Sequence, residues 1–264
     1  TLDSTDQYNE SLALGGIKTG VYNYELTAAY AAIANGGTYY KPILYTKVLD
    51  HDGNVLIDNT QKPVTVLKDT TAALLTSAME DVVSKGTAAP YAQLNNMAVA
   101  GKSGTTSYNK DFWFSGYTPY YTCSIWLGYD DNKEMNGSNW YYHEKIWAKI
   151  MNRIDSELNL PYKDFSMPST IERKTICTET GLLAIPGECP SLTEYFAPGT
   201  APTETCGGHY VEPEPEEEPD DTDDNNHSGS NNSNDNNNNS GTTAPTTPTE
   251  PTTPSEPSTD PDTE

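Results

Sequence analysis

Four consecutive residues, Lys102-Ser103-Gly104-Thr105, have types that together suit the recognition of a carboxylate. Lys102 supplies a fixed positive charge, and Ser103 and Thr105 supply hydroxyl donors. Gly101 and Gly104 remove side chains where a ligand must lie against the backbone. The backbone of an exposed strand can also pair with an extended peptide. The motif therefore indicates a binding site for a peptide carboxylate; the alternative is a Gly-rich strand end with a solvated lysine.

The residues around this motif predict a small antiparallel sheet. The apolar segment 97–100 has the composition of a strand that leads into the motif, and the segments 112–117 and 121–129 have that of two further strands. Strands joined by short turns pair antiparallel. The motif is therefore expected at the end of the first of three consecutive antiparallel strands.

Helices are predicted on either side of these strands. Apolar residues recur at helical spacing in the segments 23–35, 70–85 and 142–158. A His-Asp-Gly-Asn turn joins two further strand-like segments, 43–49 and 55–57, and predicts a hairpin. The expected fold class is α+β, an antiparallel sheet flanked by helices.

Local signals also predict the ends and inner faces of the helices. Asn23 and Asp69 are the expected N-caps of the first two helices, because their side chains accept hydrogen bonds from helix N–H groups. The residues expected to face the core are Leu75, Met79, Val82 and Val83 in the second helix and Ile146, Trp147, Ile150, Met151 and Ile154 in the third.

The charge of the chain is concentrated at its C-terminal end. The formal net charge is −23 over 264 residues, and the 15 acidic residues of the segment 211–264 leave only −8 on the rest. This segment contains no Lys, Arg or aromatic residue, so it cannot bury enough apolar surface to fold and is predicted to be disordered. Nothing is basic enough to indicate a nucleic-acid partner.

Four cysteines are present. Cys123 lies in an apolar alternation and is expected to be a buried free thiol. Cys177, Cys189 and Cys206 lie in a loop-rich segment, and in an oxidising compartment two of the three are expected to pair, although the sequence does not say which. Three free thiols in a reducing setting are the alternative. We expect no metal ligand set and no cofactor.

The motifs and their surroundings resemble class A (bifunctional) penicillin-binding proteins of the Gram-positive type. The resemblance runs in order over roughly residues 7 to 206. It is carried by the motif at 102–105 and by the segments 12–16, 25–37, 41–42, 111–119, 126–130 and 177–202.

The resemblance implies an organisation in three parts. Residues 1–165 would be the C-terminal part of a penicillin-binding transpeptidase domain, 166–210 a Cys-containing extension, and 211–264 the acidic tail. The family has three active-site motifs, Ser-x-x-Lys, Ser-x-Asn and Lys-Ser/Thr-Gly. The first two lie upstream in the family, so we expect them before Thr1 and the nucleophilic serine to be missing.

Two strings imitate the family motifs. Ser107-Tyr108-Asn109-Lys110 spells both Ser-x-x-Lys and Ser-x-Asn, but it follows the strand directly, whereas the nucleophile needs the start of a helix. Lys18-Thr19-Gly20 spells the third motif, but it precedes a helix instead of lying on a strand. Both are interpreted as coincidences, the second as a turn.

The mechanism implied by the resemblance is acyl transfer from a serine that cross-links peptidoglycan. Lys102 would hold a proton network beside the missing serines and attract the substrate carboxylate. Ser103 and Thr105 would bind that carboxylate or the carboxylate of a β-lactam. The Thr105 N–H would be half of the oxyanion hole, and Gly104 would permit the approach. Trp113 would wall the cleft or be an ordinary core aromatic.

The resemblance also implies partners and a location. The partners would be stem peptides ending in D-Ala-D-Ala and β-lactam antibiotics, and not nucleic acid. The protein would act at the extracellular face of the cytoplasmic membrane or in the cell wall, held by an upstream anchor that accompanies a glycosyltransferase domain. A fragment without the serine would be inactive by itself. The alternative function is a non-catalytic wall-binding or β-lactam-sensing module.

Overall fold

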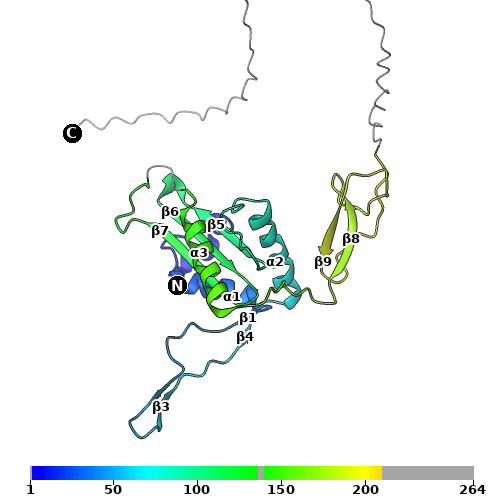
Figure 1. The fold of residues 1–264 in the computed structure, drawn as a ribbon. Helices are drawn as coiled ribbons and strands as arrows, with labels where there is room; N and C mark the ends of the chain where they lie inside the picture. The colour runs from blue at the N-terminus through cyan, green and yellow to red at the C-terminus, as the bar shows by residue number, and fades with distance from the viewer. Residues whose placement is uncertain (1, 136–139, 210–264) are drawn as a thin grey trace, which may run out of the picture. The chain divides into compact units, whose positions relative to one another are not determined.

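The computed structural model describes residues 2–135 and 140–209 (Figure 1). The predicted disordered tail, 211–264, lies outside these residues. In the described ranges, no helix combines the length and the apolar character that crossing a membrane requires.

The central sheet has three antiparallel strands, β5 (Ala100–Thr105), β6 (Asp111–Tyr117) and β7 (Thr122–Gly128). Their order is β5-β6-β7, so β5 and β7 are the edges. The predicted pairing is confirmed, but the strand begins later than predicted. Ala98 donates its N–H to the Lys163 carbonyl at 3.4 Å and not to the sheet, so the motif lies inside β5 rather than behind its end.

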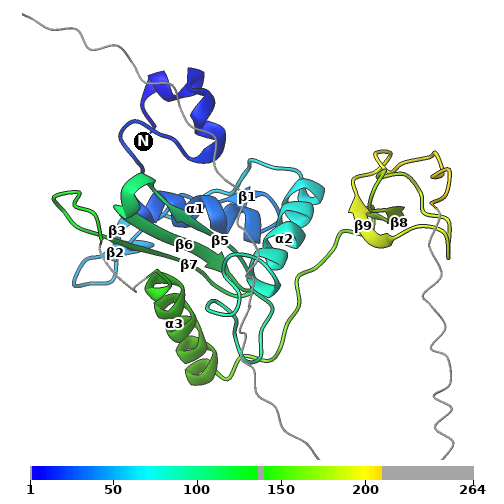
Figure 2. The same ribbon diagram turned by 90° about the horizontal axis from the view of Figure 1, so that it is seen from above.

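Helices flank the sheet as the sequence predicts (Figure 2). They are α1 (Asn23–Ala34), α2 (Asp69–Ser84) and α3 (Tyr142–Leu158). Helices α1 and α3 lie on opposite faces of the sheet, and α2 runs beside β5 (Figure 2).

The predicted N-caps are wrong by one residue. Tyr22 and Lys68 occupy the cap positions of α1 and α2. At α1 the Glu25 carboxylate accepts the Tyr22 N–H at 3.4 Å. The Asn23 side chain instead donates from Nδ2 to the Ser124 carbonyl of β7 at 3.3 Å. The Asn23 side chain, which was expected to cap the start of the helix, therefore links the helix to the sheet.

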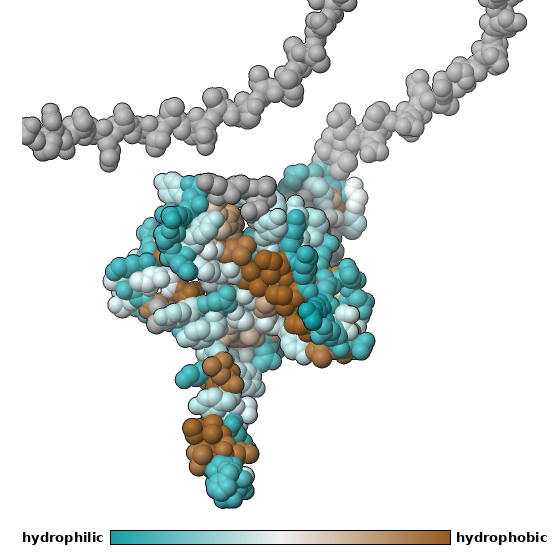
Figure 3. Space-filling model, turned by 60° about the vertical axis from the view of Figure 1, so that its left-hand side comes forward, coloured by the Kyte–Doolittle hydropathy of each residue, from teal (hydrophilic) through white to brown (hydrophobic). Residues whose placement is uncertain are grey.

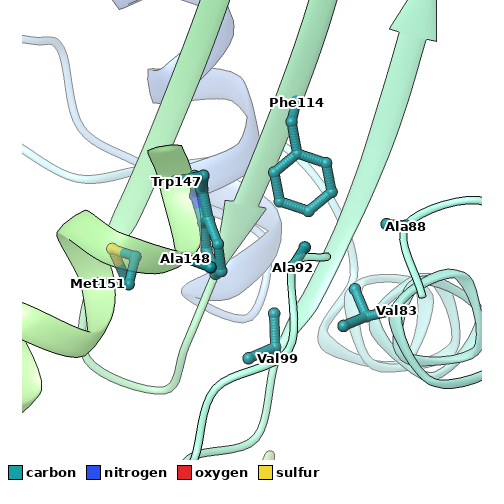
Figure 4. Close-up of a cluster of buried hydrophobic side chains, with 8 residues drawn as sticks. All are labelled: Val83, Ala88, Ala92, Val99, Phe114, Trp147, Ala148 and Met151. Carbon is teal, nitrogen blue, oxygen red and sulfur yellow. The ribbon is translucent and has the colours of Figure 1, made fainter. Parts of the chain in front are cut away.

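The main core lies between β6, α3 and the end of α2 (Figure 4). Trp147 and Phe114 meet edge to face with ring centroids 5.1 Å apart. The indole Nε1 of Trp147 donates to the Cys123 carbonyl at 3.0 Å, so α3 is held to β7 by a hydrogen bond as well as by packing. The buried members of this cluster are Val83, Ala88, Ala92, Val99, Phe114, Trp147, Ala148 and Met151.

The predicted inner face of α3 is confirmed for Trp147 and Met151 but not for the two isoleucines beside them. Ile146 and Ile150 are 38% and 39% exposed, whereas Trp147 and Met151 are buried. The buried face of α3 is therefore narrower than predicted and centres on Trp147, whose ring fills the space over Phe114.

A second core cluster joins α1 and α2 to β5 and β6. Met79, Ala100 and Tyr117 form its buried centre. The Tyr117 hydroxyl and the Thr76 hydroxyl are 2.8 Å apart, so the buried polar groups satisfy each other. The predicted inner face of α2 is confirmed for Met79 but not for Leu75, which is 41% exposed.

The predicted hairpin is confirmed, with a shorter first strand and a second strand one residue longer than predicted. It consists of β2 (Lys47–Leu49) and β3 (Val55–Asp58), which pair antiparallel. The Asp50 carboxylate accepts the Asn54 N–H at 2.8 Å and fixes the turn. All four residues of β3 are exposed, and Figure 3 shows apolar side chains on this hairpin.

Two-residue strands close the loop that carries this hairpin. They are β1 (Thr38–Tyr39) and β4 (Val64–Thr65), which pair antiparallel and were not predicted.

Residues 167–209 contain a separate small hairpin, β8 (Glu172–Cys177) with β9 (Ser191–Phe196). Leu183 bridges this hairpin to the chain around Thr205. The only buried residues in this segment are Cys177 and Cys206. All four cysteines of the chain are unbridged, so the expected pairing of two of them is not found.

Candidate active site at the edge strand

The motif lies on the edge strand β5, and the hydrogen-bond pattern shows which backbone groups point outward. The Thr106 N–H donates to the Asp111 carbonyl of the neighbouring strand at 3.1 Å. Hydrogen-bonded and non-hydrogen-bonded pairs alternate along antiparallel strands. The N–H and carbonyl groups of Ser103 and Thr105 therefore point away from β6, toward the open edge.

Lys102 brings a positive charge to the same edge. Its ammonium donates to the Ser103 carbonyl at 2.8 Å, which is one of the outward-facing groups. Lys102 is exposed and makes no ion pair among the residues that the structure describes. A cation and two backbone N–H donors, those of Ser103 and Thr105, therefore stand on one edge, where they suit an extended ligand that carries a carboxylate.

The hydroxyl groups of the motif differ in their surroundings. The Ser103 hydroxyl lies 2.9 Å from the Thr87 hydroxyl, in the segment that follows α2. This contact orients Ser103. The Thr105 side chain is exposed, so its hydroxyl is open to a ligand.

Gly101, just before the motif, and Gly104, within it, differ in whether packing requires a glycine. A Cβ at Gly101 would lie 2.7 Å from the ring of Phe114 and 3.0 Å from the Gly116 Cα, so Gly101 is required by packing. The expectation that it clears space for a ligand is wrong. A Cβ at Gly104 would meet only the Trp113 Cβ, at 3.6 Å, so this position has no packing reason to be glycine.

Trp113 lies directly across from Gly104 in the register of β5 and β6. Its ring centroid is 6.4 Å from that of Trp126, whose Nε1 donates to Asp111 at 2.9 Å. The other carboxylate oxygen of Asp111 accepts the Thr106 hydroxyl at 2.9 Å. Trp113 is half-buried in this group, and both roles weighed for it, cleft wall and packing residue, stay open.

A buried ionisable pair at the start of α3 was not predicted. The side chains of His143 and Glu144 are 2% and 1% exposed, with Nε2 and Oε1 3.9 Å apart. The His143 ring lies 5.6 Å from that of Phe112, which pairs with Thr105 in the sheet.

Burial decides the charge of this pair. It raises the pKa of Glu144 to about 7, against the opposing effect of the positive charge of Lys102. It lowers the pKa of His143 to about 4, so the imidazole is neutral at pH 7. The sequence did contain a signal for this burial, because His143 precedes the buried Trp147 by one helical turn.

The two imitating strings do not resemble a nucleophile site. Ser107 and Asn109 belong to a short 3-10 turn between β5 and β6, with a left-handed Tyr108 between them at φ 60°. Lys110 follows this turn, so Ser107 and Lys110 are not one turn apart on a helix. Lys18 lies in a bend before α1, as predicted, and its ammonium is 3.9 Å from the carboxylate of Asp3.

A groove of about 1010 Å³ lies elsewhere, between α1 and the turn that joins β6 to β7. Its walls include Tyr24, Ala28 and Tyr120. Among the described residues, none that lines it belongs to the motif, and Lys41 is its one charged lining residue. We therefore locate the candidate site at the edge of β5.

Two family models match the chain. One is described as the penicillin binding protein transpeptidase domain and matches residues 3–154; the other, penicillin-binding protein 1A, C-terminal domain, matches residues 167–210.

Similar proteins carry related names. Penicillin-binding protein 1A of Clostridium perfringens is 35% identical over 197 residues, 72% of this chain and 23% of that protein. Penicillin-binding protein 1A/1B of Bacillus subtilis is 31% identical over 232 residues, 80% of this chain and 25% of that protein. A crystal structure of penicillin-binding protein 1A from Haemophilus influenzae aligns with a TM-score of 0.61 at 25% identity, over 77% of this chain and 36% of that one. The chain thus spans about a quarter of the length of these curated relatives.

Proposed function

Because the chain belongs to the penicillin-binding protein transpeptidase family, in its class A, Gram-positive form, we propose that it supplies the peptide-binding strand of a serine D,D-transpeptidase. One observation supports this most directly. The open edge of β5 carries outward N–H groups of Ser103 and Thr105 together with the ammonium of Lys102.

The proposed substrate is a peptidoglycan stem peptide that ends in D-Ala-D-Ala. It would lie extended along β5 and pair with the outward backbone groups, as peptides do when they add a strand to a sheet. Lys102 would attract its terminal carboxylate, and the hydroxyls of Ser103 and Thr105 would bind it. The absence of a side chain at Gly104 leaves the strand accessible on the face that carries Trp113.

The proposed reaction proceeds in two acyl transfers. A serine hydroxyl outside residues 1–264 attacks the penultimate D-Ala carbonyl, an ester forms, and the C–N bond to the terminal D-Ala breaks. The serine proton passes through the Lys102 network to the departing amine. An amine of a neighbouring stem peptide then attacks the ester and regenerates the serine. The Thr105 N–H would stabilise the oxyanion together with the N–H of the serine itself.

The other parts of the proposal concern the whole protein. The transpeptidase part would end near residue 165, the Cys-containing extension would span 166–210, and the acidic tail would span 211–264. A β-lactam would occupy the same edge as the stem peptide. The site would face the outside of the cell, with an anchor and a glycosyltransferase domain elsewhere in the protein. Residues 1–264 would be inactive by themselves.

The test uses a longer protein that contains this chain together with its upstream Ser-x-x-Lys segment. Lys102→Ala should reduce the rate of acylation by a fluorescent penicillin about 100- to 1,000-fold, because a preorganised charged donor is lost. Lys18→Ala is the matched control and should change little, because the Lys18 ammonium is exposed and lies near the Asp3 carboxylate, outside the motif. Residues 1–264 alone should form no covalent adduct. Equal effects of the two substitutions, or an adduct on Ser107, would contradict the proposal.

Release of D-alanine separates the two candidate functions. A transpeptidase releases D-alanine from a stem peptide, whereas a wall-binding or β-lactam-sensing module leaves the peptide intact. If the longer protein binds stem peptide without releasing D-alanine, the alternative is favoured.

A further inference from the structure

Three sulfur atoms and one imidazole converge in the small module of residues 167–209. The ligand atoms of Cys177, Cys189, Cys206 and His209 all lie within 4.8 Å of one another. The Nε2 atom of His209 is 3.1 Å from the Cys177 sulfur and 3.2 Å from the Cys206 sulfur. These residues are up to 32 positions apart in the sequence, so the fold brings them together.

We propose that Cys177, Cys189, Cys206 and His209 bind one Zn²⁺ ion as a structural Cys₃His site. Three thiolates and an imidazole are the ligands of closed tetrahedral zinc sites, whereas Ca²⁺ and Mg²⁺ select oxygen ligands. With Zn–S bonds of about 2.3 Å and a Zn–N bond of about 2.0 Å, tetrahedral ligand atoms lie about 3.5–3.8 Å apart. The observed spacings fit this geometry with small shifts of the side chains.

The backbone around the cluster holds its ligands in place. Cys177 is the last residue of β8, and its N–H donates to the Leu182 carbonyl at 2.8 Å. The Cys206 N–H donates to the Leu183 carbonyl at 2.9 Å, so two ligands are fixed through adjacent residues. The Ile185 N–H points at the Cys189 sulfur at 3.4 Å, where it stabilises the thiolate that a metal requires.

A carboxylate orients the histidine. The Nδ1 atom of His209 lies 3.1 Å from the carboxylate of Glu179, and Nε2 faces the sulfurs. A proton on Nδ1 donated to Glu179 leaves the lone pair of Nε2 for the metal. Metal-bound histidines commonly have this carboxylate partner. Zn²⁺ replaces the three thiol protons, and three thiolates with a neutral imidazole leave the centre with one negative charge.

The module lacks the apolar core that would hold it otherwise. Cys177 and Cys206 are its only buried residues between 167 and 209. Segments of about 40 residues usually need a metal or disulfides, because they bury too little surface. One disulfide would use two of the three cysteines, and it would give no role to the third cysteine or to His209. A metal uses all four groups, and this corrects the expectation that the chain has no metal ligand set.

The proposal is tested on residues 1–264, produced with an added secretion signal and purified without reductant from the medium. Elemental analysis should find one zinc per chain, and thiol titration after denaturation with a chelator should find four free thiols. Co²⁺ in place of zinc should produce the intense visible bands of tetrahedral cobalt thiolates. Cys206→Ser should remove these bands, whereas the control Cys123→Ser should keep them, because Cys123 packs against the core of the central sheet.

Cys206→Ser could lose the metal because the module unfolds, so a second pair of variants changes residues that are not ligands. Glu179→Gln should weaken Zn²⁺ affinity about 10- to 100-fold, since it removes the partner of His209. Glu194→Gln on β9 changes the charge equally without touching the cluster and should leave the affinity unchanged. Two free thiols without zinc would replace the proposal with a disulfide. Four free thiols without Co²⁺ uptake would also overturn it, and neither result bears on the proposed transpeptidase activity.

Discussion

Gly101→Ala and Gly104→Ala add the same methyl group to the same strand, and the structure predicts opposite effects on stability. At Gly101 the new Cβ would lie 2.7 Å from the Phe114 ring and 3.0 Å from both the Gly116 Cα and the Ser115 carbonyl oxygen. At Gly104 its only neighbour is the Trp113 Cβ, at an ordinary 3.6 Å. The two neighbourhoods differ in packing alone, because neither glycine has a left-handed backbone.

The magnitudes follow from two competing terms. Replacing glycine by alanine restricts the unfolded chain and stabilises the folded one by about 0.4–1 kcal/mol at a compatible position. Overpacking in a close-packed core costs about 1–3 kcal/mol. Phe114 is fully buried and the other two neighbours are backbone, so little can move away from Ala at position 101. We therefore expect Gly101→Ala to destabilise the chain by roughly 1–2 kcal/mol, and Gly104→Ala to stabilise it by up to ~1 kcal/mol.

Urea unfolding followed by tryptophan fluorescence measures both changes, since Trp147 and Trp113 report on the sheet and its core. Equal unfolding midpoints for the two variants would refute the packing reason for Gly101. In the longer protein, Gly104→Ala should slow acylation by a penicillin although the fold is intact, because the methyl group would narrow the face of β5 beside Trp113. Unchanged acylation would show that a ligand does not approach this face.

Two further substitutions test the buried end of α3. Burial raises the pKa of Glu144 to about 7 from 4.5 and lowers that of His143 to about 4 from 6.5, so rising pH destabilises the folded chain through Glu144 and stabilises it through His143. Glu144→Gln removes the contribution of Glu144 to stability, which falls as the pH rises. The urea midpoint should then increase more steeply with pH between pH 4.5 and 6.5 than in the unchanged chain. Equal slopes would contradict the assignment of these two pKa shifts to burial. Trp147→Phe keeps an aromatic ring but loses the hydrogen bond to the Cys123 carbonyl. It should lower the free energy of unfolding by about 1–3 kcal/mol in the same assay. An unchanged free energy would show that this carbonyl is satisfied by another donor and that the hydrogen bond does not hold α3 to β7.

The parts of the fold that were predictable from the sequence depend on local signals. The antiparallel order of β5, β6 and β7 follows from short turns between apolar segments, and α3 has the predicted bounds. Which members of a predicted apolar face are fully buried depends on the elements packed against the helix. Ile146 and Trp147 were both expected to face the core, and the space over Phe114 is filled by Trp147, while Ile146 stays 38% exposed.

The site was predictable to the extent that it is continuous in the sequence. Lys102, Ser103, Gly104 and Thr105 form one strand, so their types and order could be interpreted together. Gly101 was misinterpreted, because the residue that requires glycine at this position, Phe114, lies on the neighbouring strand. The cluster around His209 was missed, since its members are far apart in the sequence and the cysteines suggested pairing with each other.

The open edge of β5 has a consequence for the solubility of the protein. An unpaired strand edge is a template on which a second copy of the chain can add its own strand, and such pairing leads to aggregation. Proteins often prevent it with a lysine at the edge. The ammonium of Lys102 covers the Ser103 carbonyl, one of the groups that a foreign strand would have to reach. A peptide with a carboxylate can draw this ammonium away, whereas an identical edge would bring a second lysine against it. The same side chain would therefore admit the proposed anionic peptide and repel another copy of the sheet.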